Sequence, residues 1–131
     1  MTAAITIIRE IDHEKLIVRL MEEKFVHVIL KPNTEVTVEL QGEMLEMYLE
    51  ITGGKKMPFL FEGGEFVSIT KEARENAIRM EDDTPTTASA ILVRNLGQKI
   101  IADFYYKINK PKQPYKVFWS KEKALLWIQQ L

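Results

Sequence analysis

The sequence contains no cysteine among its 131 residues. That absence excludes a disulfide framework, a thiolate nucleophile and a zinc site of the cysteine type. Histidine is scarce too, since only His13 and His27 are present, and no third ligand or nucleophile is spaced near either of them. We interpret His27 as a strand side chain, and we expect a protein that has neither a metal site nor a cofactor.

The sequence also has no apolar run that approaches the roughly 20 residues needed to span a bilayer. Its first residues lack the basic segment and apolar core of a secretion signal, so we expect a cytoplasmic protein without an integral membrane segment. The formal net charge of -1 provides no overall attraction to nucleic acid, and none is expected as a partner.

Motifs that bind phosphate or perform catalysis are missing as well. Two glycine pairs, Gly53-Gly54 and Gly63-Gly64, belong neither to a P-loop nor to a G-x-G-x-x-G segment, so turns and a helix end explain them better. No nucleophile is paired with a base, which makes an enzyme the least favoured class. Four glutamates at helical spacing predict the solvated outer face of a helix: Glu39, Glu43, Glu46 and Glu50.

What the sequence does contain is a regular succession of apolar patterns. Its last third has short apolar runs at 88–95 and 115–119, and it has apolar residues at helical spacing over 97–109 and 120–131. This order predicts a strand, a helix, a second strand and a second helix. Two strands joined through a helix are expected to be parallel neighbours in one sheet.

The first two thirds of the chain add further elements. Apolar and β-branched runs predict four strands, at 4–8, 15–20, 25–30 and 57–61. Helical spacing predicts a helix over 37–51, and Thr70 or Ser68 is expected to cap a short one. The expected fold is therefore α/β: a single domain, 1–131, with a mixed, mostly parallel sheet, antiparallel N-terminal strands and about four helices.

The same spacing predicts which helical residues are buried. The helix at 97–108 is expected to bury its entire apolar stripe, whereas Tyr106 falls off the stripe and should be exposed. That stripe consists of Ile100, Ile101, Phe104, Tyr105 and Ile108. In the last helix, Trp127 is expected to lie in the core on the same face as Ala124, Ile128 and Leu131.

Several segments of the last third form a recognisable succession: the strand from Ala88 to Val93, the aromatic pair Phe104-Tyr105, the proline loop 111–114, the strand 116–118, and the helix from Ser120 to Trp127 with its Ala-Leu-Leu-Trp end. This succession resembles the SpoIIAA-like branch of the STAS proteins, and the likeness covers roughly residues 57–131. The resemblance implies a non-enzymatic α/β domain used for protein interaction, and some relatives are proposed to bind small or lipid-like ligands.

STAS regulators carry a phosphorylatable Ser or Thr at a helix N-terminus after a central strand. Ser68 and Thr70 occupy that location here, and the resemblance makes them the candidates for a phosphorylation switch. The Asp-Ser or Asp-Thr dipeptide of that motif is absent, and the charges of Glu65 and Glu72 would oppose a phosphate. We therefore expect the capping role to dominate.

Open α/β sheets place ligand sites outside the carboxyl ends of their parallel strands. Three expected strands end in candidate residues, which together form the predicted ligand-binding or partner-binding site. These residues are Glu62, Gly63, Gly64, Arg94, Asn95, Trp119 and Ser120.

Charge is divided unevenly along the chain. Residues 94–131 hold eight basic and two acidic residues, whereas residues 1–93 hold ten basic and seventeen acidic ones. Unlike patches attract, so we expect a weak, salt-sensitive homodimer in which the acidic face of the helix 37–51 meets the basic loop 107–116. The alternative, that folding mixes the two signs, stays open.

Two hypotheses for function remain. The first is a non-enzymatic regulatory or protein-interaction module of STAS type, whose protein partner the sequence does not identify. The second is a carrier of a small or lipid-like ligand, held in an apolar cavity between the sheet and the helices 97–108 and 120–131.

Overall fold

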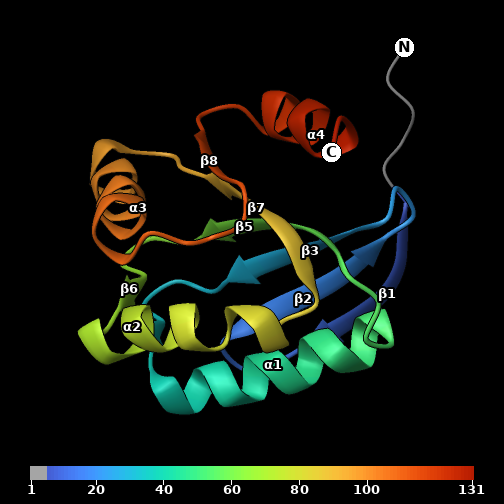
Figure 1. Cartoon of the computed structure of the whole chain (residues 1–131), viewed down its shortest axis with the longest axis horizontal. Coiled ribbons are helices and arrows are strands. Elements are labelled where there is room, and N and C mark those ends of the chain that lie inside the picture. Colours follow the sequence, from blue (N-terminus) through green and yellow to red (C-terminus); the bar gives the residue numbers. More distant parts are fainter. Residues whose placement is uncertain (1–5) are drawn as a thin grey trace.

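The computed structural model describes residues 6–131, which form a six-stranded sheet with helices on both faces (Figure 1). The strand order is β1-β2-β3-β5-β7-β8. The bounds are β1 Ile7–Asp12, β2 Leu16–Met21, β3 Phe25–Leu30, β5 Met57–Gly63, β7 Thr86–Leu92 and β8 Tyr115–Phe118.

The sheet is mixed, as the sequence predicts. β1, β2 and β3 pair antiparallel, and β3, β5, β7 and β8 pair parallel. Each parallel strand is connected to the next through a helix, which is the connection that parallel pairing requires.

Each of the four α-helices begins at a polar residue whose side chain accepts a hydrogen bond from a backbone N–H of the first turn. These caps are Thr37, Thr70, Asn95 and Ser120. The helices are α1 Val38–Thr52, α2 Lys71–Arg79, α3 Leu96–Asn109 and α4 Lys121–Gln129, and a 3-10 turn, η1, covers Glu81–Asp83. Gly53 and Gly54 follow α1 with φ of 65° and 81°, the left-handed conformation that glycine adopts without strain.

Alternation along the strands divides the core between the two faces of the sheet. Phe59 of β5 belongs to the apolar cluster that includes Leu40 and Tyr48 of α1, whereas Leu60 belongs to the cluster that includes Ala124 and Ile128 of α4. The helices α1 and α4 therefore cover opposite faces of the sheet, as Figure 1 shows.

Three expectations about the elements need correction. The first strand spans 7–12 rather than 4–8, and residues 4 and 5 of that expectation lie outside the described part of the chain. A short parallel pair, β4 Glu35–Val36 with β6 Ser68–Ile69, was not predicted, because two residues are too few to show a period. The last helix, α4, ends at Gln129, so Leu131 lies beyond it and is 56% exposed, while Trp127 is half-buried against Phe118, with their ring centroids 5.6 Å apart.

The largest departure concerns α3, whose apolar stripe is not buried. Its fully buried residue is Ala102, while four apolar residues spaced four apart face outward. They are Leu96, Ile100, Phe104 and Ile108, and we call them the α3 ridge. The helix turns Ala102 and the stripe residue Tyr105 toward the sheet, whereas the other four residues of the predicted stripe are exposed. Tyr106 is 54% exposed, as predicted.

Candidate functional site

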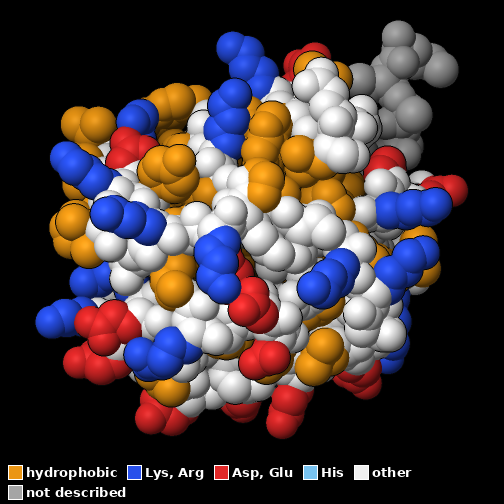
Figure 2. Space-filling view, viewed as in Figure 1, with side chains coloured by type: hydrophobic (Ala, Val, Ile, Leu, Met, Phe, Trp, Pro, Cys, Tyr) orange, Lys and Arg blue, Asp and Glu red, His pale blue; other side chains and the backbone are white. Residues whose placement is uncertain are grey.

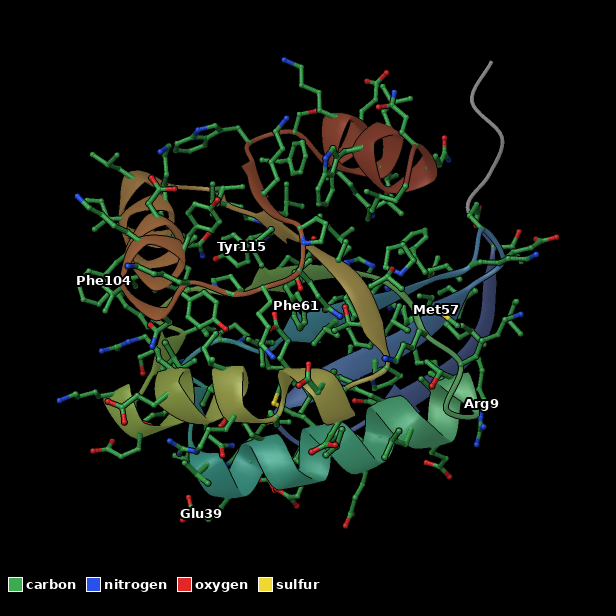
Figure 3. The ribbon with its side chains drawn as sticks, in the orientation of Figure 1. Arg9, Glu39, Met57, Phe61, Phe104 and Tyr115 are labelled. Atoms are coloured by element: carbon green, nitrogen blue, oxygen red, sulfur yellow. The ribbon has the colours of Figure 1, made fainter. Side chains whose placement is uncertain are left out.

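A cavity of about 310 Å³ lies beneath α3, between that helix and the face of the sheet that α1 and α2 also cover. Its floor is formed by residues of β5, β7 and β8, including Phe61, Ser89 and Tyr115, and α1 contributes Met44 and Tyr48 to its wall. Figure 3 shows Phe61 and Tyr115 within this region, with Phe104 pointing away from it on the outside of α3.

The cavity exists because α3 is held away from the sheet by a few specific contacts. Near its start, Nε2 of Gln98 donates a hydrogen bond of 3.2 Å to the carbonyl oxygen of Gly63. At its middle, the hydroxyl of Tyr115 donates to the carbonyl oxygen of Ala102 at 2.9 Å, and Tyr105 and Tyr106 both contact the Tyr115 ring. Large aromatic spacers and small residues such as Ala102 leave unfilled space between them.

The lining is mostly apolar, and its buried polar groups differ in how well they are satisfied. Gln41 donates to the carbonyl oxygen of Ala73 at 2.7 Å and accepts from Asn76 at 2.9 Å. The hydroxyl of Tyr48 is buried and has no hydrogen-bond partner among the described residues. Burial raises the pKa of Tyr48 far above its ordinary value, so this hydroxyl stays protonated and is available as a donor.

Tyr105 and Tyr115 are affected in the same direction. Burial, together with the nearby charge of Glu81, raises the pKa of Tyr105 to about 12. Burial also raises the pKa of Tyr115. All three tyrosines that line the cavity are therefore neutral near pH 7, and none supplies a charge to it.

At the carboxyl ends of the parallel strands, the structure brings together part of the predicted site. Oε1 of Glu62 lies 3.3 Å from Nη2 of Arg94, and the carbonyl oxygen of Gly63 accepts the hydrogen bond from Gln98. Asn95 and Ser120 cap α3 and α4. Trp119 is 55% exposed, and among residues 6–131 no hydrogen bond or ion pair joins Trp119 or Ser120 to Glu62.

His27 is the residue at this site that the sequence analysis missed. It is 3% exposed, and its Nε2 lies 3.4 Å from Oε2 of Glu62. The close contact with His27, strengthened by the charges of Arg94 and Lys121, holds the pKa of Glu62 below its usual range. Because side chains alternate along a strand, His27 and Glu62 lie on the same face of the sheet. The sequence can indicate this contact only once β3 is known to lie beside β5.

The second glycine pair has a packing role. A side chain at Gly64 would place its Cβ 2.8 Å from the backbone nitrogen of Pro32, closer than real Cβ atoms come to other heavy atoms. The N–H of Gly64 also donates to the carbonyl oxygen of Leu30 at 2.8 Å. These contacts explain why glycine stands there, without any bound phosphate.

The two candidates for phosphorylation occupy different settings. Thr70 accepts a hydrogen bond of 3.0 Å from the N–H of Ala73, which is the capping role expected from the sequence. Ser68 is exposed in β6. Whether either residue is phosphorylated stays a prediction.

Residues 6–131 contain neither a metal-binding cluster nor a membrane-spanning helix. No group of three or more His, Cys, Asp or Glu side chains is arranged so that it could hold a metal ion. No helix in this part of the chain combines the length and the apolar character that crossing a membrane requires.

Comparison with known proteins supports the SpoIIAA-like architecture. A crystal structure of an uncharacterized protein from the DUF3478 family, from Shewanella loihica PV-4, has a SpoIIAA-like fold and superimposes with a TM-score of 0.55. The alignment covers 98% of each chain at 18% sequence identity, a level that shows the fold alone. No curated protein matches. The model of a domain of unknown function, DUF7793, matches residues 19–131, and the chain therefore belongs to the DUF7793 family.

Proposed function

We propose that the protein is a non-enzymatic regulatory module of the STAS type that acts in the cytoplasm by binding a protein partner through the α3 ridge. The observation that carries this proposal is the exposure of the ridge. Leu96, Ile100, Phe104 and Ile108 are between 47% and 65% exposed, although all four lie on one ordered helix. Soluble proteins rarely leave a contiguous apolar patch uncovered unless it binds something.

Figure 2 shows hydrophobic side chains gathered over α3, with blue lysine and arginine side chains among them. At Phe104 the ridge lies beside α2, because the guanidinium of Arg74 from α2 sits 5.3 Å from the centre of the Phe104 ring. Lys107 is exposed on α3 itself. Asp103 is the acidic residue of this helix, and it is paired with Lys99.

The positive charges beside the ridge indicate the kind of partner that it would bind. Arg74 and Lys107 form no ion pair among residues 6–131, and an apolar ridge flanked by such cations complements an amphipathic segment in which carboxylates flank apolar anchors. We therefore propose that the partner presents such a segment, as a helix laid along α3. The apolar anchors would supply affinity, whereas Arg74 and Lys107 would fix orientation and increase the rate of association.

A two-stage experiment tests the proposal. A photo-crosslinking residue at position 100 is compared in the native cell with one at position 126, because Leu126 is exposed to a similar extent, 52% against 59%, on α4 across the sheet. A protein captured from position 100 alone is then purified and its dissociation constant is measured. Ile100→Glu should weaken this complex at least about tenfold, and Leu126→Glu should leave it unchanged.

Two results would overturn the proposal. One is equal capture from both positions, which would mark nonspecific contact. The other is a purified complex whose affinity does not change with Ile100→Glu.

A further inference from the structure

We propose that the cavity beneath α3 is a binding site for a neutral, mainly apolar small molecule, such as a long-chain alcohol or ester. This inference goes beyond the proposed function, because the ridge lies on the outside of α3 and the cavity on its inside. None of the described residues of α4 lines the cavity, so it does not lie between the sheet and both C-terminal helices, as the sequence hypothesis expected.

The size of the cavity suits a ligand. Small-molecule pockets usually begin at about 300 Å³, and an apolar cavity of about 150 Å³ accommodates benzene. At about 310 Å³ the cavity has roughly twice that room. It extends from Gly63 and Gln98, near the carboxyl ends of the strands, to Thr86 and Gln113 at the other end of β7. This shape fits an elongated molecule better than a compact ring.

The charges around the cavity exclude an ionised ligand. Among the described residues that line it there is no lysine, arginine or histidine, so a buried carboxylate or phosphate would find no cation. The charged lining residues are Glu62 and Glu81. Glu62 is already paired with Arg94, and the carboxylate of Glu81 accepts hydrogen bonds from the backbone N–H groups of Lys112 and Gln113. A cationic ligand would therefore find no free carboxylate either.

Tyr48 belongs to the lining, but its hydroxyl is too deeply buried to reach the surface of the cavity. Gln41, the other buried polar side chain contributed by α1, uses its carbonyl oxygen and one of its two amide hydrogens within the protein. The lining therefore offers a ligand mainly apolar contacts.

The cavity opens to solvent beside α3. Ile101 lines the cavity and is 46% exposed, which places it at an opening between the interior and solvent. A ligand can therefore enter without unfolding of the sheet.

The test uses Nile red, a neutral apolar dye, as the probe, with 1-decanol and decanoate as competitors of equal chain length. We expect saturable dye binding at one site per chain. We also expect displacement by decanol at a concentration at least about tenfold lower than that needed with decanoate, because the cavity offers the carboxylate no cation. Equal competition by the two would overturn the neutral character of the site.

Two variants locate the site. Ser89→Leu fills the floor of the cavity and should reduce dye binding at least about tenfold, whereas Ile100→Glu on the ridge should leave it unchanged.

The melting temperature of the ligand-free protein separates ligand binding from folding. Ser89→Leu should keep a cooperative melting transition, which shows that its loss of dye binding comes from the filled cavity and not from unfolding. Dye binding that survives Ser89→Leu would overturn the site. The effect of Ile100→Glu on dye binding shows whether the cavity and the ridge are independent.

Discussion

His27 and Glu62 show how a site can form from residues that look unrelated in the sequence. They lie on different strands, yet the parallel pairing of β3 with β5 brings Nε2 of His27 to 3.4 Å from Oε2 of Glu62. Arg94 approaches the other oxygen of the same carboxylate from the end of β7. Because Glu62 is well shielded from solvent, its ionised form depends on both neighbours.

This arrangement predicts how stability changes with pH. The folded-state pKa of Glu62 is depressed below its ordinary value of 4.5, so the protein gains stability from this group above pH 4.5 and loses it as the pH falls through the folded-state pKa. Urea unfolding of the native protein and of Glu62→Gln should therefore differ most near pH 7. The difference should shrink below pH 4.5, and a difference that widens on acidification would contradict the assignment.

Single residues were predictable where local chemistry decides their role. Thr70, Asn95 and Ser120 cap helices because their side chains accept hydrogen bonds from nearby N–H groups, and Thr70 and Ser120 were expected to do so. Arg94 and Glu62 were predicted together because both follow strands. The pairing of His27 and the partnerless hydroxyl of Tyr48 depend on distant neighbours, and no local pattern indicates either.

Elements were predictable for a similar reason. The helix expected over 37–51 is α1, and it buries apolar residues at helical spacing, including Leu40, Met44 and Ile51. Its outer face is exposed at Glu39, Glu43, Glu46 and Glu50, also as expected. Period and capping define where a helix starts and which side is apolar. They do not define what covers that side.

α3 demonstrates this limit. Its apolar stripe is as regular as that of α1, but only part of it reaches the cavity, and the ridge faces solvent. Apolar residues that pack against the sheet and apolar residues that remain exposed on a helix recur with the same period. The difference lies in Tyr105, Tyr106 and Tyr115, whose bulk sets the height of α3 above the sheet.

Stability measurements distinguish the two kinds of stripe. Leu40 is 2% exposed, so Leu40→Ala should lower the free energy of unfolding by about 2 to 5 kcal/mol. Ile100 is 59% exposed, so Ile100→Ala should change it by no more than about 0.5 kcal/mol. Chemical denaturation of both variants provides the comparison. A loss at position 100 as large as that at position 40 would show that α3 packs more tightly than the structure describes.

At the scale of the whole molecule, the two signs of charge are only partly separated. The glutamates of α1 are exposed, and so are Lys107, Lys110, Lys112 and Lys116 around the end of α3. Folding does mix some of them, because Lys112 pairs with Asp82 at 3.1 Å and Arg9 pairs with Glu50 at 3.5 Å. The separation that remains is enough to orient two copies and not enough to hold them, since exposed ion pairs contribute only about 0.2 to 1 kcal/mol each.

We therefore expect a weak homodimer in which the acidic face of α1 meets the basic end of α3 on a second copy. A two-fold axis would form this contact twice and close the assembly. Sedimentation at high protein concentration should show the dimer at low salt and the monomer at high salt, because the Debye length falls from about 30 Å at 0.01 M to about 3 Å at 1 M.

Charge reversal identifies the cause of the association. Glu46→Lys and Lys116→Glu each replace an exposed residue, so each should weaken the dimer without lowering the melting temperature. Combining them in one chain restores opposite signs across the contact and should recover part of the affinity. A strict monomer at low salt would remove the dimer altogether. A dimer that is indifferent to salt and to both reversals would keep the assembly and assign it to apolar contacts, such as those of the exposed α3 ridge.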